Sequence, residues 1–331
     1  MMKAPAFWWQ KPGLIAYLLS PFAGLYGAMA SARLMRQGVK APCPVICIGN
    51  FVAGGAGKTP LALSIAQHLK EMGERPVFLS RGHGGVLPGP VLVDDVQHGP
   101  HDVGDEPLLL ARHAPTIIAR DRVAGARLAA KHGTIVIMDD GMQNPSVQKD
   151  LILAVIDAIQ ALGNGLCLPA GPLRAPFDAQ TPLVDFCVVV GGQAPEIITR
   201  PFKDRVLSAR LVPDAGMADA LKGRTVYAFC GIGRPQKFID TLEASGVKIA
   251  LREDFPDHHP FTRLEIEHVL AEARRIHALP VTTAKDHVRI MAAAPDLADK
   301  IAVLPVTLVF EDEDHILSLI HISEPTRPER I

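Results

Sequence analysis

Residues 45–60 read VICIGNFVAGGAGKTP and decide the fold of this chain. The four apolar residues at 45–48 have the character of a buried strand, and the segment 61–72 after the glycines is amphipathic. A strand, a glycine-rich turn and a helix form a phosphate-binding loop, because side chains in the turn would keep phosphate away from the backbone N–H groups. The residues predicted to bind a nucleotide are Gly54, Gly55, Ala56, Gly57, Lys58 and Thr59.

Two side chains of this loop have defined tasks in a phosphate site. Lys58 would reach the β- and γ-phosphates of the nucleotide, and the Thr59 hydroxyl would bind Mg²⁺. Val52 stands where the commonest pattern has glycine, so the loop is nearer the G-G-x-G-K-T variant. The alternative is an ordinary glycine-rich turn with a surface lysine, which the flanking strand and helix disfavour.

Composition limits the classes of protein that this chain can represent. Its 331 residues suggest about two domains, and 34 Lys and Arg against 35 Asp and Glu show no basic excess for binding nucleic acid. The five cysteines form no C-x-x-C pair, which indicates reduced thiols rather than a disulfide framework or a zinc site. The sequence also contains no G-x-S-x-G motif, so a serine hydrolase is unsupported.

The N-terminal region predicts an attachment to a membrane. Residues 12–32 carry no charged side chain, and as a helix they would extend about 31 Å, near the hydrocarbon thickness of a bilayer. Trp8 and Trp9 precede this segment, and Arg33 follows it, which would leave the rest of the chain in the cytoplasm. Pro21 weakens a spanning helix, so spanning, lying in the interface and burial in a soluble domain all stay open.

Four acidic residues lie next to apolar segments of the sequence. Residues 134–138 predict a buried strand that ends in Asp139 and Asp140, as the Mg²⁺-binding strand of a phosphate-loop enzyme does, and the alternative is a solvated turn. Asp105 and Glu106 precede an apolar run. They are either the acidic first turn of a helix or carboxylates brought close to the phosphates, and the sequence alone does not choose.

The order of the elements predicts an α/β fold. Near-continuous apolar strands at 76–80, 151–156 and 184–190 indicate a mostly parallel sheet with helices on both faces, as in P-loop NTPases. A smaller α/β unit follows, in which residues 301–310 are expected to form the last strand. The predicted division is 1–34 for the membrane-associated helix, 35–215 for the core domain, 216–315 for the smaller domain and 316–331 for a disordered or non-native tail.

Taken together, these motifs resemble the tetraacyldisaccharide 4′-kinases, the lipid A 4′-kinases of Gram-negative bacteria. The resemblance covers roughly residues 5–312. Three positions depart from the family pattern: His83, Met142 and Ala284 stand where tyrosine, phenylalanine and glutamate are expected. The motifs are FWW at 7–9, GN at 49–50, GGAGKTP at 54–60, SRG at 80–82, VGDEP at 103–107, DDGMQ at 139–143, LPAGPLR at 168–174, GIGRP at 231–235, DHH at 257–259 and TTAKD at 282–286.

The resemblance implies ATP-dependent phosphorylation of the 4′-hydroxyl of a tetraacyldisaccharide 1-phosphate at the cytoplasmic face of the bacterial inner membrane. ATP and Mg²⁺ would be the cofactors. The lipid substrate and the membrane surface would be the partners, with no nucleic acid and no obligate protein partner indicated.

The resemblance also assigns roles to single residues. Asp105 would accept the proton of the attacking hydroxyl, with Lys58 on the phosphates and either His258 or His259 hydrogen-bonded to Asp105. These histidines belong to the second domain, so closure of the two domains would be required. Thr59, Glu106, Asp139 and Asp140 are the candidate Mg²⁺ ligands, and Arg81, Arg120, Arg122 and Arg174 are the candidate contacts for substrate or transferring phosphate.

Other functions are compatible with parts of the pattern. A switch ATPase of the partitioning or site-selection type, with no small-molecule acceptor, would have a lysine before the first glycine, where this chain has Ala53. A GTPase would need an Asn/Thr-Lys-x-Asp motif, and residues 283–286 have the wrong spacing. A membrane-tethered nucleotide sensor would leave the carboxylates without a task.

Overall fold

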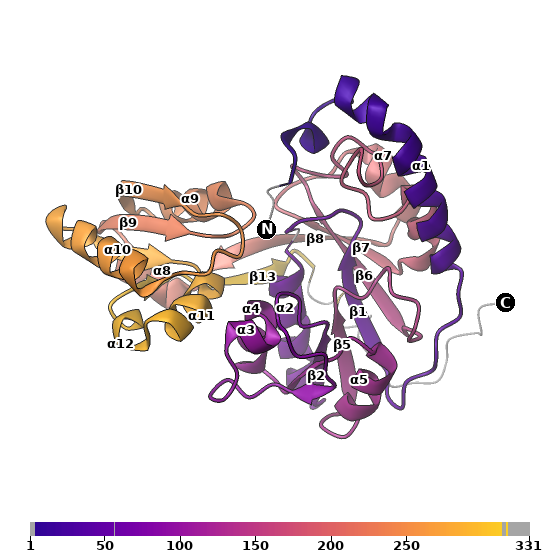
Figure 1. Ribbon diagram of the computed structural model, residues 1–331, viewed down its shortest axis with the longest axis horizontal. Helices are drawn as coiled ribbons and strands as arrows, with labels where there is room; N and C mark the ends of the chain where they lie inside the picture. Colours follow the sequence, from indigo (N-terminus) through magenta and orange to yellow (C-terminus); the bar gives the residue numbers. More distant parts are fainter. Residues whose placement is uncertain (1–3, 56, 313–315, 317–331) are drawn as a thin grey trace.

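The computed structural model describes residues 4–55, 57–312 and 316 (Figure 1). The predicted nucleotide contact at Ala56 and the predicted disorder of the tail from 317 onward therefore lie outside the described residues. Within the described part, nine strands form one sheet in the order β13-β8-β7-β6-β1-β5-β2-β4-β3. These strands are β1 (Val45–Asn50), β2 (Pro76–Ser80), β3 (Val91–Leu92), β4 (Thr116–Ile118), β5 (Ile135–Asp139), β6 (Leu151–Asp157), β7 (Phe186–Val190), β8 (Val206–Pro213) and β13 (Val306–Phe310).

The strand β1 lies in the middle of this sheet, and this position explains why the sequence of β1 is apolar. It pairs in parallel with β5 on one side and β6 on the other, and all six of its residues are buried. Ile46 and Ile48 pack toward one face of the sheet, whereas Val45 and Cys47 pack toward the other. The predicted mostly parallel sheet is confirmed, with antiparallel pairing only at the two edge strands within the described residues.

Helices cover both faces of the large sheet. On the face of Ile46, the helix α2 packs Leu61, Ile65 and Leu69 against the strands. On the other face, the helix α5 contributes Ala126. The helices of this part are α2 (Lys58–Glu71), α3 (Pro100–Val103), α4 (Asp105–Ala111), α5 (Arg122–Ala129), α6 (Phe177–Gln180) and α7 (Glu196–Thr199), with 3-10 turns η2 (Thr181–Leu183) and η3 (Arg200–Phe202).

A smaller parallel sheet lies beside the large one, with the strand order β10-β9-β11-β12. The helix α10 begins with a capping box: Thr262 N donates to Glu265 Oε2 at 2.8 Å, and Glu265 N donates to Thr262 Oγ1 at 3.3 Å. The elements are α8 (Ala215–Leu221), β9 (Thr225–Cys230), α9 (Pro235–Ala244), β10 (Lys248–Asp254), α10 (Arg263–Arg275), β11 (Leu279–Thr282), α11 (Ala284–Ala293), α12 (Pro295–Ala298) and β12 (Ala302–Val303).

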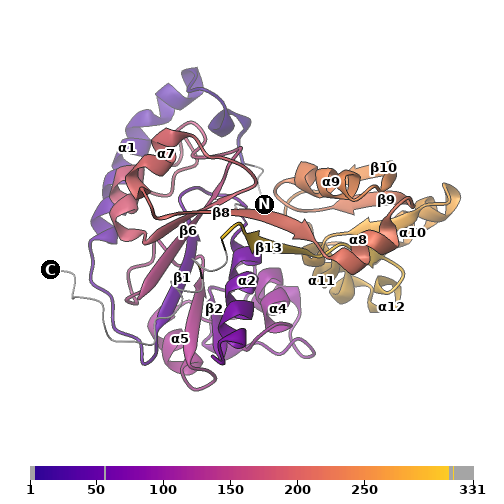
Figure 2. The ribbon, with the colours of Figure 1, turned by 180° about the vertical axis from the view of Figure 1, so that it is seen from behind.

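The end of the described chain differs from the prediction for residues 301–310. These residues form two strands, and the second, β13, pairs antiparallel with β8 in the large sheet. Figure 2 shows β8 and β13 running side by side between the two parts. Leu308 and Phe310 are buried in the core on the α2 face, so their alternation matches the large sheet. Placing 301–310 as one strand of the smaller unit is therefore wrong, and the domain boundaries remain predictions.

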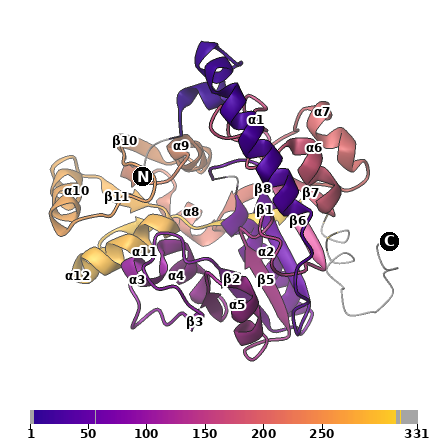
Figure 3. The same ribbon diagram turned by 45° about the vertical axis from the view of Figure 1, so that its right-hand side comes forward.

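The N-terminal helix α1 (Leu14–Leu34) follows the 3-10 turn η1 (Ala6–Trp9) and lies along the outside of the large part (Figure 3). It packs through small residues: Ala16 and Ala23 are buried, and a Cβ on Gly27 would lie 3.3 Å from Cys167 Sγ. By length and composition α1 could cross a membrane, and only 17% of its most apolar window is buried. Its exposed apolar side chains include Leu14, Ile15, Tyr17, Leu18, Phe22, Leu25 and Met29.

Candidate active site

The glycine-rich loop joins β1 to α2, which begins at Lys58. Gly54 and Gly57 have φ angles of 124° and 97°, a region that residues with a Cβ atom rarely adopt. Asn50 Nδ2 donates to Gly54 O at 3.1 Å, and Lys58 Nζ donates to Asn50 Oδ1 at 3.4 Å. Because the first N–H groups of a helix have no partner within it, the start of α2 offers donors for an anion.

Asp140 and Arg174 lie beside this loop. Arg174 Nη1 is 2.8 Å from Asp140 Oδ1, and Lys58 Nζ is 3.7 Å from the same oxygen. Arg174 Nε also donates to Val52 O at 3.1 Å, which ties its loop to the residues that precede the glycines. Asp140 has a φ of 51°, an uncommon conformation for a residue other than glycine. The structure therefore brings one predicted carboxylate and one predicted arginine to Lys58.

Asp139 ends β5 directly beside β1, with Ile48 as its partner in the parallel register. Its side chain is buried, and its Oδ1 has no hydrogen-bond partner within the described part of the chain. Burial, together with the charges of Glu106 and Asp140, raises the pKa of Asp139 to about 7. A buried carboxylate oxygen without a donor, among other carboxylates, has the chemistry that a divalent cation would satisfy.

The donor set suits Mg²⁺ rather than a metal held by protein alone. Among the residues that the structure describes, no three His, Cys, Asp or Glu side chains group closely enough to hold a metal ion. Mg²⁺ usually takes one or two carboxylates and completes its shell with water and substrate phosphates. The unpartnered oxygen of Asp139 and the buried Thr59 at the start of α2 fit this mode.

Asp105 meets a histidine from the smaller sheet. It is the first residue of α4, and His258 Nδ1 lies 2.9 Å from its Oδ2 and 3.1 Å from its Oδ1. Burial opposes ionisation of Asp105, but the hydrogen bond and charge of His258 and the charge of Arg289 lower its pKa from 3.8 to about 2. The same hydrogen bond raises the pKa of His258. The two side chains therefore form an ion pair between the two parts of the molecule.

The neighbouring histidine has different partners. His259 Nε2 is 3.0 Å from Glu265 Oε1, and its ring stacks on Phe255 with centroids 4.8 Å apart. His258 has a left-handed backbone with φ 57°, which turns the two successive side chains in different directions. Of the two histidines that the sequence left open, His258 is the one in contact with Asp105.

Two cations of the site were missed by the sequence analysis. On α11, Lys285 forms an ion pair with Glu106, and Arg289 Nε lies 3.5 Å from Asp105 Oδ2. Their spacing of four residues places both on one face of a helix, opposite α4. The sequence signal for these two cations was the spacing of four residues between Lys285, within the TTAKD motif, and Arg289.

The predicted arginines divide into two groups. Arg122 is buried and lies close enough to Asp139 for their charges to interact, and Arg81 lies near Arg122. Arg120 is exposed and donates to Val86 O at 3.2 Å. The structure thus gathers Arg174 and Arg122 around the acidic residues, while Arg81 is a neighbour of Arg122 and Arg120 contacts a different loop.

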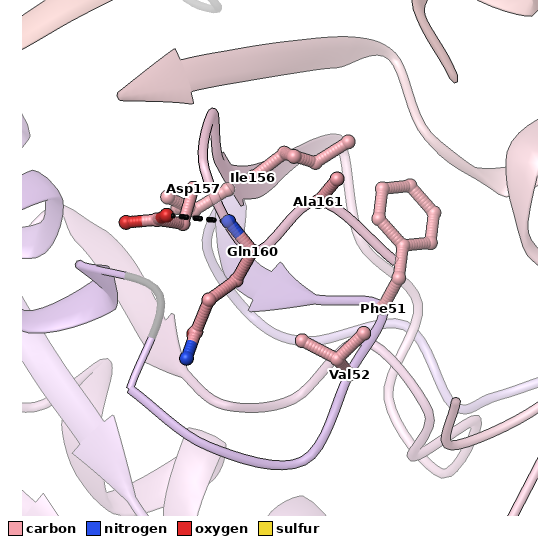
Figure 4. A pocket seen from close by; sticks show the side chains of 7 residues that line it. Phe51, Val52, Ile156, Asp157, Gln160 and Ala161 are labelled. Atoms are coloured by element: carbon pink, nitrogen blue, oxygen red, sulfur yellow. Dashed lines mark hydrogen bonds between the residues drawn. The ribbon is translucent and has the colours of Figure 1, made fainter. Parts of the chain in front are cut away.

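A second ionic contact joins the two parts at the end of β6. Asp157 ends β6 with its side chain almost fully buried, and it forms ion pairs with Arg234 and Lys237 from the start of α9. Figure 4 shows Asp157 lining a small pocket, with its carboxylate accepting from Gln160 N at 2.9 Å. The pocket is lined by Phe51, Val52, Val155, Ile156, Asp157, Gln160 and Ala161.

Comparisons with known proteins agree on one family. The family model described as Tetraacyldisaccharide-1-P 4′-kinase (LpxK) matches residues 15–322. A curated relative, Tetraacyldisaccharide 4′-kinase of Methylobacterium nodulans, is 52% identical over 322 residues, which are 96% of this chain and 94% of the relative. The protein of the same name from Rhodopseudomonas palustris strain BisB5 is 49% identical over 317 residues, 94% of each chain.

A solved structure resembles the fold over most of the chain. The crystal structure of the "apo" form of LpxK from Aquifex aeolicus in complex with ATP aligns with a TM-score of 0.73 and 26% sequence identity. The alignment covers 93% of this chain and 99% of that one. The predicted fold class and the predicted resemblance are both confirmed.

Proposed function

This chain belongs to the tetraacyldisaccharide 4′-kinase family, and from that membership we propose how its residues transfer phosphate. The protein is an ATP-dependent kinase of lipid A biosynthesis that phosphorylates the 4′-hydroxyl of a tetraacyldisaccharide 1-phosphate. The observation that carries the residue assignment is that one edge of the large sheet gathers the loop lysine, Lys58, and the carboxylates of Glu106, Asp139 and Asp140.

The loop and its neighbours would hold the nucleotide. The backbone N–H groups at the start of α2 and the Lys58 ammonium would bind the phosphates, since both present positive charge at the same place. Lys58 already lies beside the loop, with its Nζ 3.7 Å from Asp140 Oδ1 and 3.4 Å from Asn50 Oδ1. Arg174 would share this role, because Asp140 holds it beside Lys58.

Thr59 and Asp139 would hold Mg²⁺, with Glu106 as a further candidate. When bound, the ion neutralises charge that develops on the transferring phosphoryl group. Asp140 is less suited to the metal because its Oδ1 already faces two cations, Arg174 and Lys58.

Asp105 would accept the proton of the sugar hydroxyl. Phosphoryl transfer passes through a loose transition state, so the attacking hydroxyl needs orientation more than early deprotonation. A carboxylate whose pKa is about 2 is ionised at neutral pH and ready to accept a hydrogen bond from that hydroxyl. His258 would keep the carboxylate in one orientation through its Nδ1 contact.

The helix α1 would attach the enzyme to the membrane that holds its substrate. Its outward side carries Leu18, Phe22 and Leu25, each about two-thirds exposed, whereas its inward side packs on the protein. Burial of such residues in lipid is favourable, at about 25 cal/mol per Å² of apolar surface. Arg33 and Arg36 after the apolar stretch favour the cytoplasmic face of the inner membrane.

The test is transfer of label from γ-labelled ATP to a tetraacyldisaccharide 1-phosphate presented in mixed micelles. The full-length protein is expected to label the lipid at the 4′ position, and label should not move when the acceptor already carries a 4′-phosphate. Release of labelled phosphate at the same rate with and without lipid acceptor, and no labelled lipid, would instead favour a switch ATPase.

A further inference from the structure

Arg289 on α11 is buried, with its guanidinium surrounded by polar partners from several segments. Its Nη2 donates to Asp286 Oδ1 at 2.6 Å and to Gly231 O at 3.0 Å. Its Nη1 donates to His259 O at 3.3 Å. Its Nε lies 3.5 Å from Asp105 Oδ2 and has no hydrogen-bond partner within the described residues. The Nε donor of this side chain therefore lies on the side of the Asp105 carboxylate.

These partners form the frame of the turn that carries His258. Gly231 O accepts from His258 N at 3.0 Å as well as from Arg289, and Gly231 N donates to the fully buried Asp286 at 2.9 Å. His259 O, on the next residue, also accepts from Arg289. A left-handed backbone at a residue other than glycine, such as His258, is strained and persists only where its surroundings determine it. Arg289 supplies a large part of those surroundings.

We propose that Arg289 is a positioning residue that holds the His258 turn of the smaller sheet in register with Asp105 on α4. The inference rests on the proposed role of Asp105. Arginine suits this task because its planar fork directs several donors at fixed angles, whereas lysine has one compact ammonium group. Three donors of Arg289 are used on the smaller part, and the Nε donor lies toward the larger one.

The charge balance of this cluster supports the assignment. The carboxylates of Asp286 and Asp105 flank the guanidinium, and both are buried. Asp286 lies on α11 with Arg289, so the contact between the two parts adds the Asp105 carboxylate to a cation that already has one buried partner. Lys285, one helical turn away, forms its close ion pair with Glu106, and its charge lowers the pKa of Asp105 less than the charge of Arg289 does.

The principal variant is Arg289→Lys in the full-length protein, since it keeps the positive charge that Asp286 needs. We expect kcat to fall between about 10- and 100-fold, as small misplacements of catalytic groups do. The KM for ATP should change less than about twofold, because the phosphate loop is untouched, and the melting temperature should fall by only a few degrees. The matched control is Arg263→Lys, an exposed arginine paired with Asp296, for which we expect wild-type kinetics.

A double variant separates positioning from simple stability. In a His258→Ala background, adding Arg289→Lys should lower kcat by less than about twofold further, because the side chain that Arg289 positions is gone. A full multiplicative loss, or a wild-type kcat for Arg289→Lys, would overturn the inference. Arg289→Gln removes the charge. Its kcat, measured below its melting temperature in the wild-type and His258→Ala backgrounds, should show the same pattern.

The proposed function and this inference fail in different ways. If Asp105→Asn and His258→Ala both keep wild-type turnover, the assignment of Asp105 as proton acceptor is wrong. If both lose turnover while Arg289→Lys does not, only the positioning role is wrong.

Discussion

Replacing Asp105 by asparagine removes one charge from the contact between the two parts and preserves the side chain's shape. In the native protein the pKa of Asp105 falls from 3.8 to about 2, although burial acts in the opposite direction. At about 1.4 kcal/mol per pH unit, the ionised carboxylate is favoured by about 2 kcal/mol over its state in the unfolded chain. His258 and Arg289 supply that preference.

The sign of the pH dependence follows from the lowered pKa. The contribution of Asp105 to stability is fully present well above its unfolded pKa and is lost as the pH falls through the folded value. At pH 7 the free energy of unfolding of Asp105→Asn should therefore be about 2 kcal/mol lower than that of the wild type. The difference should be nearly the same at pH 5 and roughly half as large at pH 3.

Urea unfolding followed by circular dichroism at these three pH values measures the difference, with Asp95→Asn on an exposed loop as the control. Turnover of the same variant should fall about 10²- to 10⁴-fold, the usual range for loss of a general base. Equal unfolding free energies at pH 7, or a difference that grows on acidification, would refute the electrostatic reasoning. A variant with wild-type turnover would refute the role in proton transfer.

Three further predictions concern other parts of the molecule. Lys58→Ala should lose activity by at least about 10³-fold with little loss of stability, measured as label transfer at saturating ATP and as melting temperature. Phe22→Asp with Leu25→Asp should leave the enzyme active on dispersed substrate but abolish sedimentation with phospholipid vesicles. Unchanged sedimentation would show that another surface binds lipid. His258→Gln should lower the free energy of unfolding most below pH 6.5, where the contribution of protonated His258 is fully present. The difference should shrink as the pH rises through the raised pKa of His258.

The parts of this protein that are continuous in sequence could be predicted from sequence alone. The strand at 45–50, the glycine-rich turn and the helix from Lys58 are neighbours along the chain, and glycine at positive φ is a local requirement. Asp139 follows an apolar run that places it at the end of a strand beside β1, because parallel neighbours end at the same edge. Local pattern and spacing suffice for such features.

Contacts between distant segments were decided only by the tertiary structure. Asp105 and His258 are 153 residues apart, and nothing in the pattern DHH distinguishes His258 from His259 until the left-handed turn directs one of them toward α4. The return of residues 306–310 to the large sheet is likewise invisible to periodicity, which reports that a strand is buried but not which sheet buries it. Arg289 belongs to the same class, since its partners come from three segments that only folding brings together.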